Sequence, residues 1–358
     1  MLIRSGAALS MDASAPVTVR AGNSTRGSYA LGLVTATPGE YALCWASTGS
    51  TVAELTTSIG TLSLAGPAAM TAVCTLGHPC RAFLQGHRLE AANRIRIVAY
   101  AEACGGLTPS VNWTGLGASP FQSADGTNYS LGTPVTGTAG LYTVCWGADA
   151  SYMNVTVPAN LTLVGPHIAT HQCTLGLQCN ITLAGHRLGP GVASQVWVTT
   201  NATFCASGVN RLANFTGWAS FPVTEHAVEA RENATDLYVI GLATAGVPGA
   251  YQLCWRAGNG TGISAGTLNV RGTAVLPERI VCTLGVPCNV DLQGVSLSAL
   301  DHVVVVNGTC GSGTNATVPS LVSTIDPGSW AQSPRAELGT AYAGAPDTDY
   351  RLCYSPGE

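Results

Sequence analysis

The sequence predicts an all-β protein that is built from tandem repeats of about 100 residues. Three observations support this prediction. One motif that contains a cysteine recurs four times, a second recurs three times, and short runs of alternating apolar and polar residues are separated by Gly, Pro, Asn and Ser. We find no stretch of ten or more residues with the 3.6-residue period of an amphipathic helix.

The first motif has the form Tyr-x-Leu-Cys-Trp, with Val or Tyr replacing one residue in two of its copies. Its cysteines are Cys44, Cys145, Cys254 and Cys353, which lie 101, 109 and 99 residues apart. The second motif is Cys-Thr-Leu-Gly-x-x-Cys, and each copy is followed by an alternating run that ends in glycine. Its copies are Cys74–Cys80, Cys173–Cys179 and Cys282–Cys288. A further cysteine then follows at Cys104, Cys205 and Cys310.

These motifs divide the chain into four parts, which we call repeats 1 to 4. We expect the C-terminal part of a repeat at 1–65, complete repeats at 66–165 and 166–271, and a repeat that lacks its last strand at 272–358. The other repeats continue after the first motif into a strand such as Gly266–Val270, whereas repeat 4 stops soon after Cys353. We therefore expect a piece of a longer array. The alternative is that another subunit completes the two end repeats.

Within a repeat, strands are expected at alternating segments such as Arg94–Val98, Val196–Thr200 and His302–Val306. β-Branched residues are frequent, and helix-favouring lysine and glutamate are absent or rare. About 100 residues with roughly seven short strands is the size of an immunoglobulin-like sandwich. The predicted fold is therefore a series of immunoglobulin-like β-sandwich domains that are held by disulfides.

Side-chain alternation indicates how the cysteines pair. Leu253 and Trp255 share a core-facing side of their strand, so Cys254 points away from the core, while Cys179 shares the apolar side of its strand with Ile181. A bridge between Cys179 and Cys254 is therefore disfavoured among the three pairings that four cysteines allow. We favour the pairs Cys74–Cys80, Cys104–Cys145, Cys173–Cys179, Cys205–Cys254, Cys282–Cys288 and Cys310–Cys353.

Cys44 occupies the fourth cysteine position of repeat 1, and we expect its partner in the half of that repeat that lies outside this sequence. A reactive thiol or an intersubunit bridge is the alternative. Four cysteines per repeat also suit zinc, but the sequence has no Cys-x-x-Cys pair, so we expect no metal site.

Asparagine indicates the compartment. Twelve of the sixteen asparagines stand in Asn-x-Ser/Thr, against about three expected by chance. They are Asn23, Asn112, Asn128, Asn154, Asn160, Asn180, Asn201, Asn214, Asn233, Asn259, Asn307 and Asn315. We expect covalent N-linked glycans at these sites and no other cofactor; the alternative is a Thr-rich chain with unused sites. Glycans and oxidised cysteines together predict an extracellular or cell-surface protein.

Composition and motifs exclude several functions. Only 9% of residues are charged, all 15 basic residues are arginine, and the net charge is −4, so a basic nucleic-acid-binding surface is not expected. The apolar runs are far shorter than the roughly 18 residues of a membrane span. We find no Gly-x-Ser-x-Gly, His-Glu-x-x-His or phosphate-binding loop. His87 and His186 share a Gly-His-Arg-Leu pattern that the third copy lacks, which indicates a local structural role. We therefore expect no enzyme.

The tryptophans fall into two groups. Those that follow the cysteine of the first motif are expected in the cores, and they are Trp45, Trp146 and Trp255. Those in predicted loops are candidates for contacts between domains or with glycans, and they are Trp113, Trp218 and Trp330.

The fixed order of Cys-Thr-Leu-Gly-x-x-Cys, a strand ending in glycine, and Gly-x-Tyr-x-Leu-Cys-Trp resembles the tandem immunoglobulin-like repeats, of IPT/TIG or filamin type, in algal and protist extracellular glycoproteins such as those of mastigonemes. The resemblance covers essentially the whole chain. One departure is that the tyrosine lies three positions before the cysteine, whereas it lies two positions before the cysteine in antibody domains.

This resemblance implies a structural subunit of a glycosylated extracellular fibril or cell-surface filament that self-associates end to end. An adhesin or receptor ectodomain with a partner patch on its inter-strand loops is the alternative. A secreted enzyme that carries these repeats as accessory domains is a third possibility.

Overall fold

A computed structural model of the chain describes residues 2–4, 7–8, 36–45, 57–105, 108–188, 193–201, 203, 205–206, 213–224, 235–274, 279–298, 300–311, 314–315, 335–345 and 350–357. Every named element in these residues is a β-strand. The chain separates into two compact units. One unit comprises Met1–Cys74, Pro79–Thr133 and Leu141–Leu163, and the other comprises Thr75–His78, Pro134–Gly140 and Val164–Glu358.

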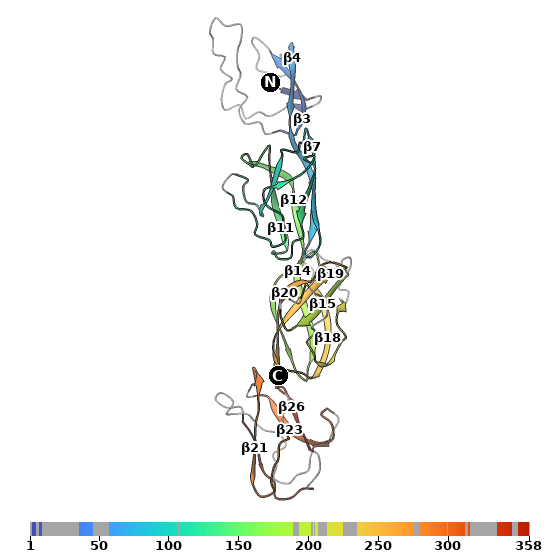
Figure 1. The fold of residues 1–358 in the computed structure, drawn as a ribbon, viewed down its shortest axis with the longest axis vertical. Helices are drawn as coiled ribbons and strands as arrows, with labels where there is room; N and C mark the ends of the chain where they lie inside the picture. Colours follow the sequence, from blue (N-terminus) through green and yellow to red (C-terminus); the bar gives the residue numbers. More distant parts are fainter. Residues whose placement is uncertain are drawn as a thin grey trace. The chain divides into compact units, whose positions relative to one another are not determined.

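The described part of repeat 1 forms a single antiparallel sheet. Its strands are β1 (Leu2–Arg4), β2 (Ala7–Ala8), β3 (Gly39–Trp45) and β4 (Thr57–Leu64), in the order β2-β1-β3-β4. Strand β3 carries the first motif, and β4 is the last strand of this repeat (Figure 1). In β3 the Tyr41 hydroxyl donates a hydrogen bond to the carbonyl of Thr37, which fixes the start of the strand.

Repeat 2 forms two sheets. One has the order β10-β7-β5 and consists of β5 (Gly66–Thr71), β7 (Cys80–His87) and β10 (Asn128–Gly132). The other has the order β12-β11-β8-β9, with β6 on the outer edge of β12, and consists of β6 (Val73–Thr75), β8 (Arg94–Ala99), β9 (Phe121–Gln122), β11 (Gly140–Gly147) and β12 (Val155–Pro166). Alternating side chains such as Leu84, Ile95 and Tyr129 are buried in its core.

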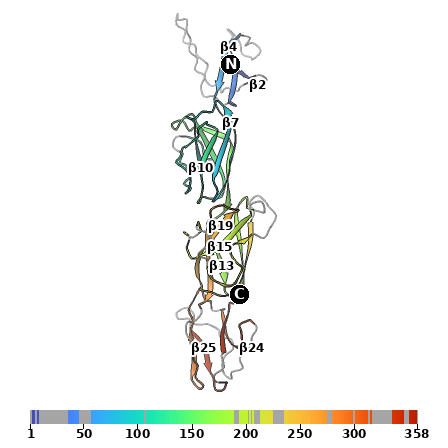
Figure 2. The ribbon, with the colours of Figure 1, turned by 45° about the vertical axis from the view of Figure 1, so that its right-hand side comes forward.

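Repeat 3 repeats this arrangement. One sheet contains β14 (Gln178–His186), β16 (Thr216–Trp218) and β18 (Thr235–Ala245), and β14 also pairs with the end of β12. The other has the order β13-β20-β19-β15-β17 and consists of β13 (Ala169–Thr174), β15 (Ser194–Thr199), β17 (Val223–Thr224), β19 (Gly249–Ala257) and β20 (Ile263–Thr273). Figure 2 shows β13, β15 and β19 within this repeat. Strand β13 runs parallel to β20, and the other pairings between the described strands of this repeat are antiparallel.

The described residues of repeat 4 form a smaller set of strands than those of repeat 3. They are β21 (Pro287–Asp291), β22 (Gly294–Val295), β23 (His302–Asn307), β24 (Thr314–Asn315), β25 (Arg335–Thr340) and β26 (Tyr350–Ser355). Strand β21 pairs with β25, β22 pairs with the end of β20, and the remaining sheet has the order β24-β23-β26. Val290, Val303 and Leu338 belong to one buried cluster that joins the two sheets, with Leu352 packed against it.

Two facing sheets of short, mostly antiparallel strands in about 100 residues make an immunoglobulin-like sandwich. The chain is therefore all-β, with tandem immunoglobulin-like domains and six disulfides, and the predicted fold class is confirmed. The boundaries that we drew between the four repeats stay a prediction.

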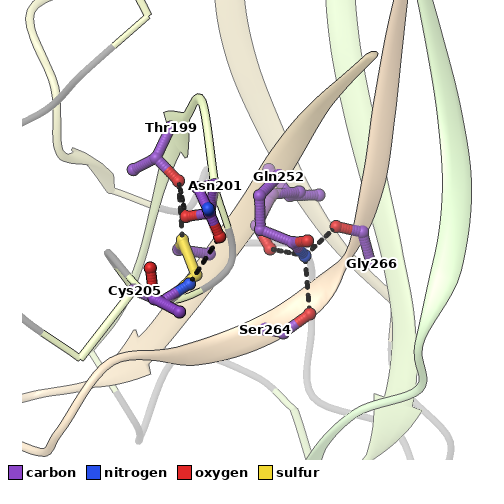
Figure 3. The surroundings of a disulfide bond; sticks show 9 residues. Thr199, Asn201, Cys205, Gln252, Ser264 and Gly266 are labelled. Atoms are coloured by element: carbon purple, nitrogen blue, oxygen red, sulfur yellow. Dashed lines mark hydrogen bonds between the residues drawn. A yellow bond between two sulfur atoms is a disulfide. The ribbon is translucent and has the colours of Figure 1, made fainter.

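The disulfides follow the pairing that side-chain alternation favoured. They join Cys74–Cys80, Cys104–Cys145, Cys173–Cys179, Cys205–Cys254, Cys282–Cys288 and Cys310–Cys353. Cys254 is nevertheless completely buried, because Trp197, Cys205 and Phe221 surround it in a second small apolar cluster. Figure 3 shows this disulfide beside Thr199 and Asn201. In repeat 3 the longer disulfide thus holds the loop that contains Cys205 against the face of the sheet on which the Cys254 side chain of β19 lies.

The tryptophan expectations are partly wrong. Trp146 and Trp255 are buried as expected, while the side chains of Trp45 and Trp330 lie outside the described residues. Trp113 is also buried, with its ring centroid 4.5 Å from that of Tyr142. Trp218 is half-buried between Phe215, at 4.0 Å, and Phe221, at 6.0 Å. Trp113 is therefore a core residue of its repeat, whereas Trp218 packs on its two aromatic neighbours and stays partly exposed.

The two disulfides of repeat 3 are predicted to differ in their contribution to stability. Cys205 and Cys254 are 49 residues apart, and Cys173 and Cys179 only six. Closing the longer loop restricts the unfolded chain more, so replacing both members by Ala should cost about 4 kcal/mol for the long bridge and about 2 kcal/mol for the short one. Denaturant unfolding of the two double variants tests this. Equal losses would contradict the loop-length argument.

Candidate functional site: the junctions between repeats

A glycine stands at each point where one repeat joins the next. Gly66 follows β4 after a single residue, whereas Gly165 and Gly272 lie inside the continuous strands β12 and β20. All three glycines pair with the end of the second motif's strand in the same register. The pairs are Gly66 with His87, Gly165 with His186, and Gly272 with Val295. At Gly272 the same strand, β20, therefore pairs first within repeat 3 and then with β22 of repeat 4.

A second glycine permits this close approach. Gly86, Gly185 and Gly294 pair with the residue that follows each junction glycine. A Cβ at any of these three positions would overlap the carbonyl oxygen of the junction glycine opposite. This steric overlap explains why each alternating run in the sequence ends in glycine, because any other residue would place a Cβ there.

In repeats 2 and 3, the leucine of the Cys-Thr-Leu-Gly loop packs on the junction glycine at the end of the repeat. Leu76 N donates to the carbonyl of Val164 at 3.0 Å, and Leu175 N donates to that of Arg271 at 3.0 Å. A Cβ at Gly165 would lie 2.6 Å from Leu76 Cδ1. At Gly272 it would lie 2.9 Å from the Cβ of Leu175. We call this contact, made by Leu76 with Gly165 and by Leu175 with Gly272, the junction clasp.

The glycine of the same loop binds a different part of the repeat. Gly77 N donates to the carbonyl of Pro134 at 2.8 Å, and Gly176 N donates to that of Ala243 at 2.8 Å. In repeats 2 and 3 the short disulfide loop is thus held both to the last strand and to the segment before the tyrosine strand. This explains why a six-residue bridge recurs, because it fixes the loop that forms the clasp.

The junction at Gly272 also contains a buried ion pair. Arg271 Nη2 lies 2.8 Å from Asp301 Oδ1, and the Asp301 side chain is fully buried. Asp301 also accepts backbone hydrogen bonds from Ser298, at 2.8 Å, and Gly357, at 3.0 Å. A buried carboxylate is tolerated when it is paired and hydrogen-bonded in this way. Burial, together with this carboxylate, raises the pKa of the nearby Tyr354 hydroxyl.

The junction at Gly66 carries an exposed polar cluster instead. Glu40 Oε1 accepts a hydrogen bond from Ser63 at 2.7 Å and lies 2.8 Å from His87 Nε2, which is itself 3.0 Å from the Ser63 hydroxyl. The hydrogen bond from Ser63, followed by that from His87, lowers the pKa of Glu40. One imidazole nitrogen faces both partners, so the geometry is not that of a Ser-His-acid relay, in which the acid binds the other nitrogen. His87 has the local role that we expected.

Every predicted glycosylation site whose burial the structure describes is exposed. These sites are Asn112, Asn128, Asn154, Asn160, Asn180, Asn201, Asn214, Asn259 and Asn307. Asn23, Asn233 and the side chain of Asn315 lie outside the described residues. The side chain of Asn201 accepts a hydrogen bond from Thr203 N at 3.1 Å, which forms a local turn at that site. Surface position is what a glycan requires, and glycosylation itself stays a prediction.

Among the residues that the structure describes, no group of three His, Cys, Asp or Glu side chains is placed to hold a metal ion. The same residues include no helix that is long and apolar enough to cross a bilayer. Cys44 lies half-buried in β3.

No protein-family model and no curated protein sequence matches this chain. The solved structures that resemble it include the I67–I69 fragment of the titin I-band, with 13% identity over 80% of this chain and 95% of that one, and a TM-score of 0.18. Another is the teleost fish polymeric immunoglobulin receptor ectodomain, with 11% identity over 57% of this chain and 99% of that one, and a TM-score of 0.19. A third is Drosophila OTK, extracellular domains 3–5, with 10% identity over 81% and 93%, and a TM-score of 0.18.

At these TM-scores the comparisons carry no argument about function, and the assignment of the fold rests on the strand order given above. None of the three supports the finer resemblance to mastigoneme proteins. The six disulfides indicate an oxidising, extracellular-type compartment.

The junction clasp predicts a cost for Gly165→Ala that a matched variant lacks. Gly165 and Gly140 share a φ of +154°, but a Cβ at Gly140 would have no neighbour within 4 Å, whereas one at Gly165 would meet Leu76. Both variants incur backbone strain of about 1–2 kcal/mol, and Gly165→Ala should lose about 1–2 kcal/mol more. Adding Leu76→Ala should recover part of this extra loss. Equal losses of unfolding free energy for the two single variants would contradict the clasp.

Asp301→Asn is predicted to destabilise repeat 4 by about 3 kcal/mol or more, because it leaves Arg271 without a buried counter-charge. Hydrogen exchange of β23 and β26 in increasing denaturant measures the loss. Arg88→Ala is the control, since Arg88 is exposed and lies 3.5 Å from an exposed Glu40. A loss as small as that of the control would show that the buried pair does not hold the junction.

Proposed function

We propose that this chain is a structural subunit of an extracellular, N-glycosylated fibril or cell-surface filament in which tandem immunoglobulin-like domains associate end to end. The observation that carries the proposal is the junction at Gly272, where the single strand β20 pairs within repeat 3 and its end pairs with β22 of repeat 4. A strand shared in this way transmits tension through backbone hydrogen bonds and leaves no linker to extend.

The distribution of the glycosylation sites supports a structural role. Asn128, Asn160, Asn180 and Asn307 are exposed on the strands β10, β12, β14 and β23, and sites such as Asn112 and Asn259 lie between strands. Only 9% of the residues are charged. Glycans on the sheets and loops of every repeat keep the surface of such a chain hydrated and soluble. They also prevent lateral pairing of exposed strand edges, which restricts association to the ends.

Electron microscopy of the non-reduced, glycosylated protein tests this function. The proposal expects filaments with an axial repeat built from multiples of about 35–40 Å, the length of one sandwich. Enzymatic removal of the N-glycans should turn separate filaments into lateral bundles. Dispersed particles that show no end-to-end order at high concentration would overturn the proposal and favour the adhesin or receptor ectodomain.

A further inference from the structure

The outer face of one sheet in repeat 2 carries an exposed aromatic side chain. Strand β7 is the middle strand of the sheet β10-β7-β5 (Figure 2), and its alternate residues Arg81, Phe83 and Gln85 are exposed. Phe83 itself is 49% exposed. On β5 the residue opposite Phe83 is Thr71, which is also exposed. The phenyl ring therefore lies among polar neighbours on its own strand and on β5.

On β10 the residue opposite Phe83 is a predicted glycosylation site. The antiparallel register pairs Asn128 with Phe83, and both residues are exposed. Directly opposed residues of antiparallel strands project from the same face, with their Cβ atoms about 4.5–5.5 Å apart. Ser130, which completes the Asn-Tyr-Ser motif, is exposed on this face as well, opposite Arg81. The attachment point for a glycan thus lies beside the phenyl ring.

Repeats 3 and 4 differ from repeat 2 in both members of this pair. The position of Phe83, the third after the second cysteine of the Cys-Thr-Leu-Gly-x-x-Cys motif, is taken by the exposed polar residues Thr182 and Asp291. Thr182 is opposite Leu237 and Asp291 is opposite Arg335, neither of which is a glycosylation site. One exposed apolar side chain is common on protein surfaces. What distinguishes Phe83 is that the aromatic residue stands in the one repeat of the three in which a glycosylation site faces this position.

We infer that Phe83 is the binding surface for the first sugar of an N-glycan on Asn128. One face of a pyranose ring consists mainly of C–H groups, whose partial positive charge is attracted to the negative face of an aromatic ring. Packing the two rings together also removes apolar surface of both from water. Covalent attachment at Asn128 makes the contact intramolecular, so a weak interaction is sufficient to hold the sugar on the ring.

This inference rests on the N-glycosylation in the proposed function, and it adds the position that one glycan takes on the sheet. The sugar covers the exposed ring at the middle of the outer face, so the glycan protects apolar surface as well as strand edges. The contact is local to repeat 2, and it is made whether or not the chain forms a filament.

Hydroxyl-radical footprinting of the secreted, glycosylated chain tests the contact. The control protein is Ser130→Ala, which removes the glycosylation site and leaves Asn128 in place. Phe83 should be oxidised about threefold more slowly in the glycosylated chain, because the sugar covers most of the exposed ring. Tyr100, which is 57% exposed, should react equally in both proteins and so shows that the variant is folded. Enzymatic trimming of the glycans to one sugar should preserve the protection of Phe83.

A double-mutant cycle measures the same contact as stability. Phe83→Thr introduces the residue that repeat 3 has at this position, and hydrogen exchange of β7 and β10 in increasing denaturant gives the unfolding equilibrium constant of the sheet. The substitution should raise this constant about fivefold in the glycosylated chain and less than about twofold in the Ser130→Ala background. Tyr100→Thr is the matched control, and its effect should be the same in both backgrounds.

Two results would overturn the inference. One is equal oxidation of Phe83 in both proteins, or an equal effect of Phe83→Thr in both backgrounds, when mass spectrometry shows a glycan on Asn128. The other is a secreted chain in which Asn128 carries no glycan. Protection of Phe83 in a chain that forms no filaments would refute the proposed function alone, and filaments in which Phe83 is unprotected would refute only this contact.

Discussion

Each complete repeat depends on one backbone interaction, the double pairing of its last strand. That strand closes one sheet, covers the Cys-Thr-Leu-Gly loop, and then becomes the first strand of the next repeat through a glycine. Leu175 is buried where it contacts Gly272, as Leu76 is where it contacts Gly165. The short disulfide, the loop hydrogen bonds and the glycine pairs all serve this arrangement.

The three junctions have the same pattern of backbone pairing, but their side-chain contacts differ. Arg271 and Asp301 form a buried ion pair at one junction, while Glu40, Ser63 and His87 form an exposed cluster at another. Replacing one partner of the buried pair leaves an uncompensated charge, whereas the exposed cluster is screened by water and salt. The common backbone therefore fixes the register, and the side chains adjust the strength of each junction.

Local patterns predicted much of the fold. Spacing revealed the repeats, and alternation around Cys179 and Cys254 favoured the pairing that the structure has. The contacts that alternation does not encode were missed. Trp113 falls in a segment that was predicted to be a loop, and only the folded chain brings it against Tyr142. The neighbours of Trp218, Phe215 and Phe221, are only three residues away in the sequence, but alternation does not predict that the three rings pack together. The clasp was missed because Leu76 and Gly165 are far apart in sequence, although the recurring glycine after each repeat was a signal that could have indicated it.

The most direct measurement is the hydrogen-exchange rate of three backbone amides in the folded chain of residues 1–358, those of Leu76 and Leu175 and that of Leu284, which has the same position of the motif in repeat 4. The first two donate to the carbonyls of Val164 and Arg271 on a last strand. If the last strand holds the loop, both should exchange far more slowly than the amide of Leu284. Similar exchange rates at all three would show that the loops are stable by themselves, and the central claim would be wrong.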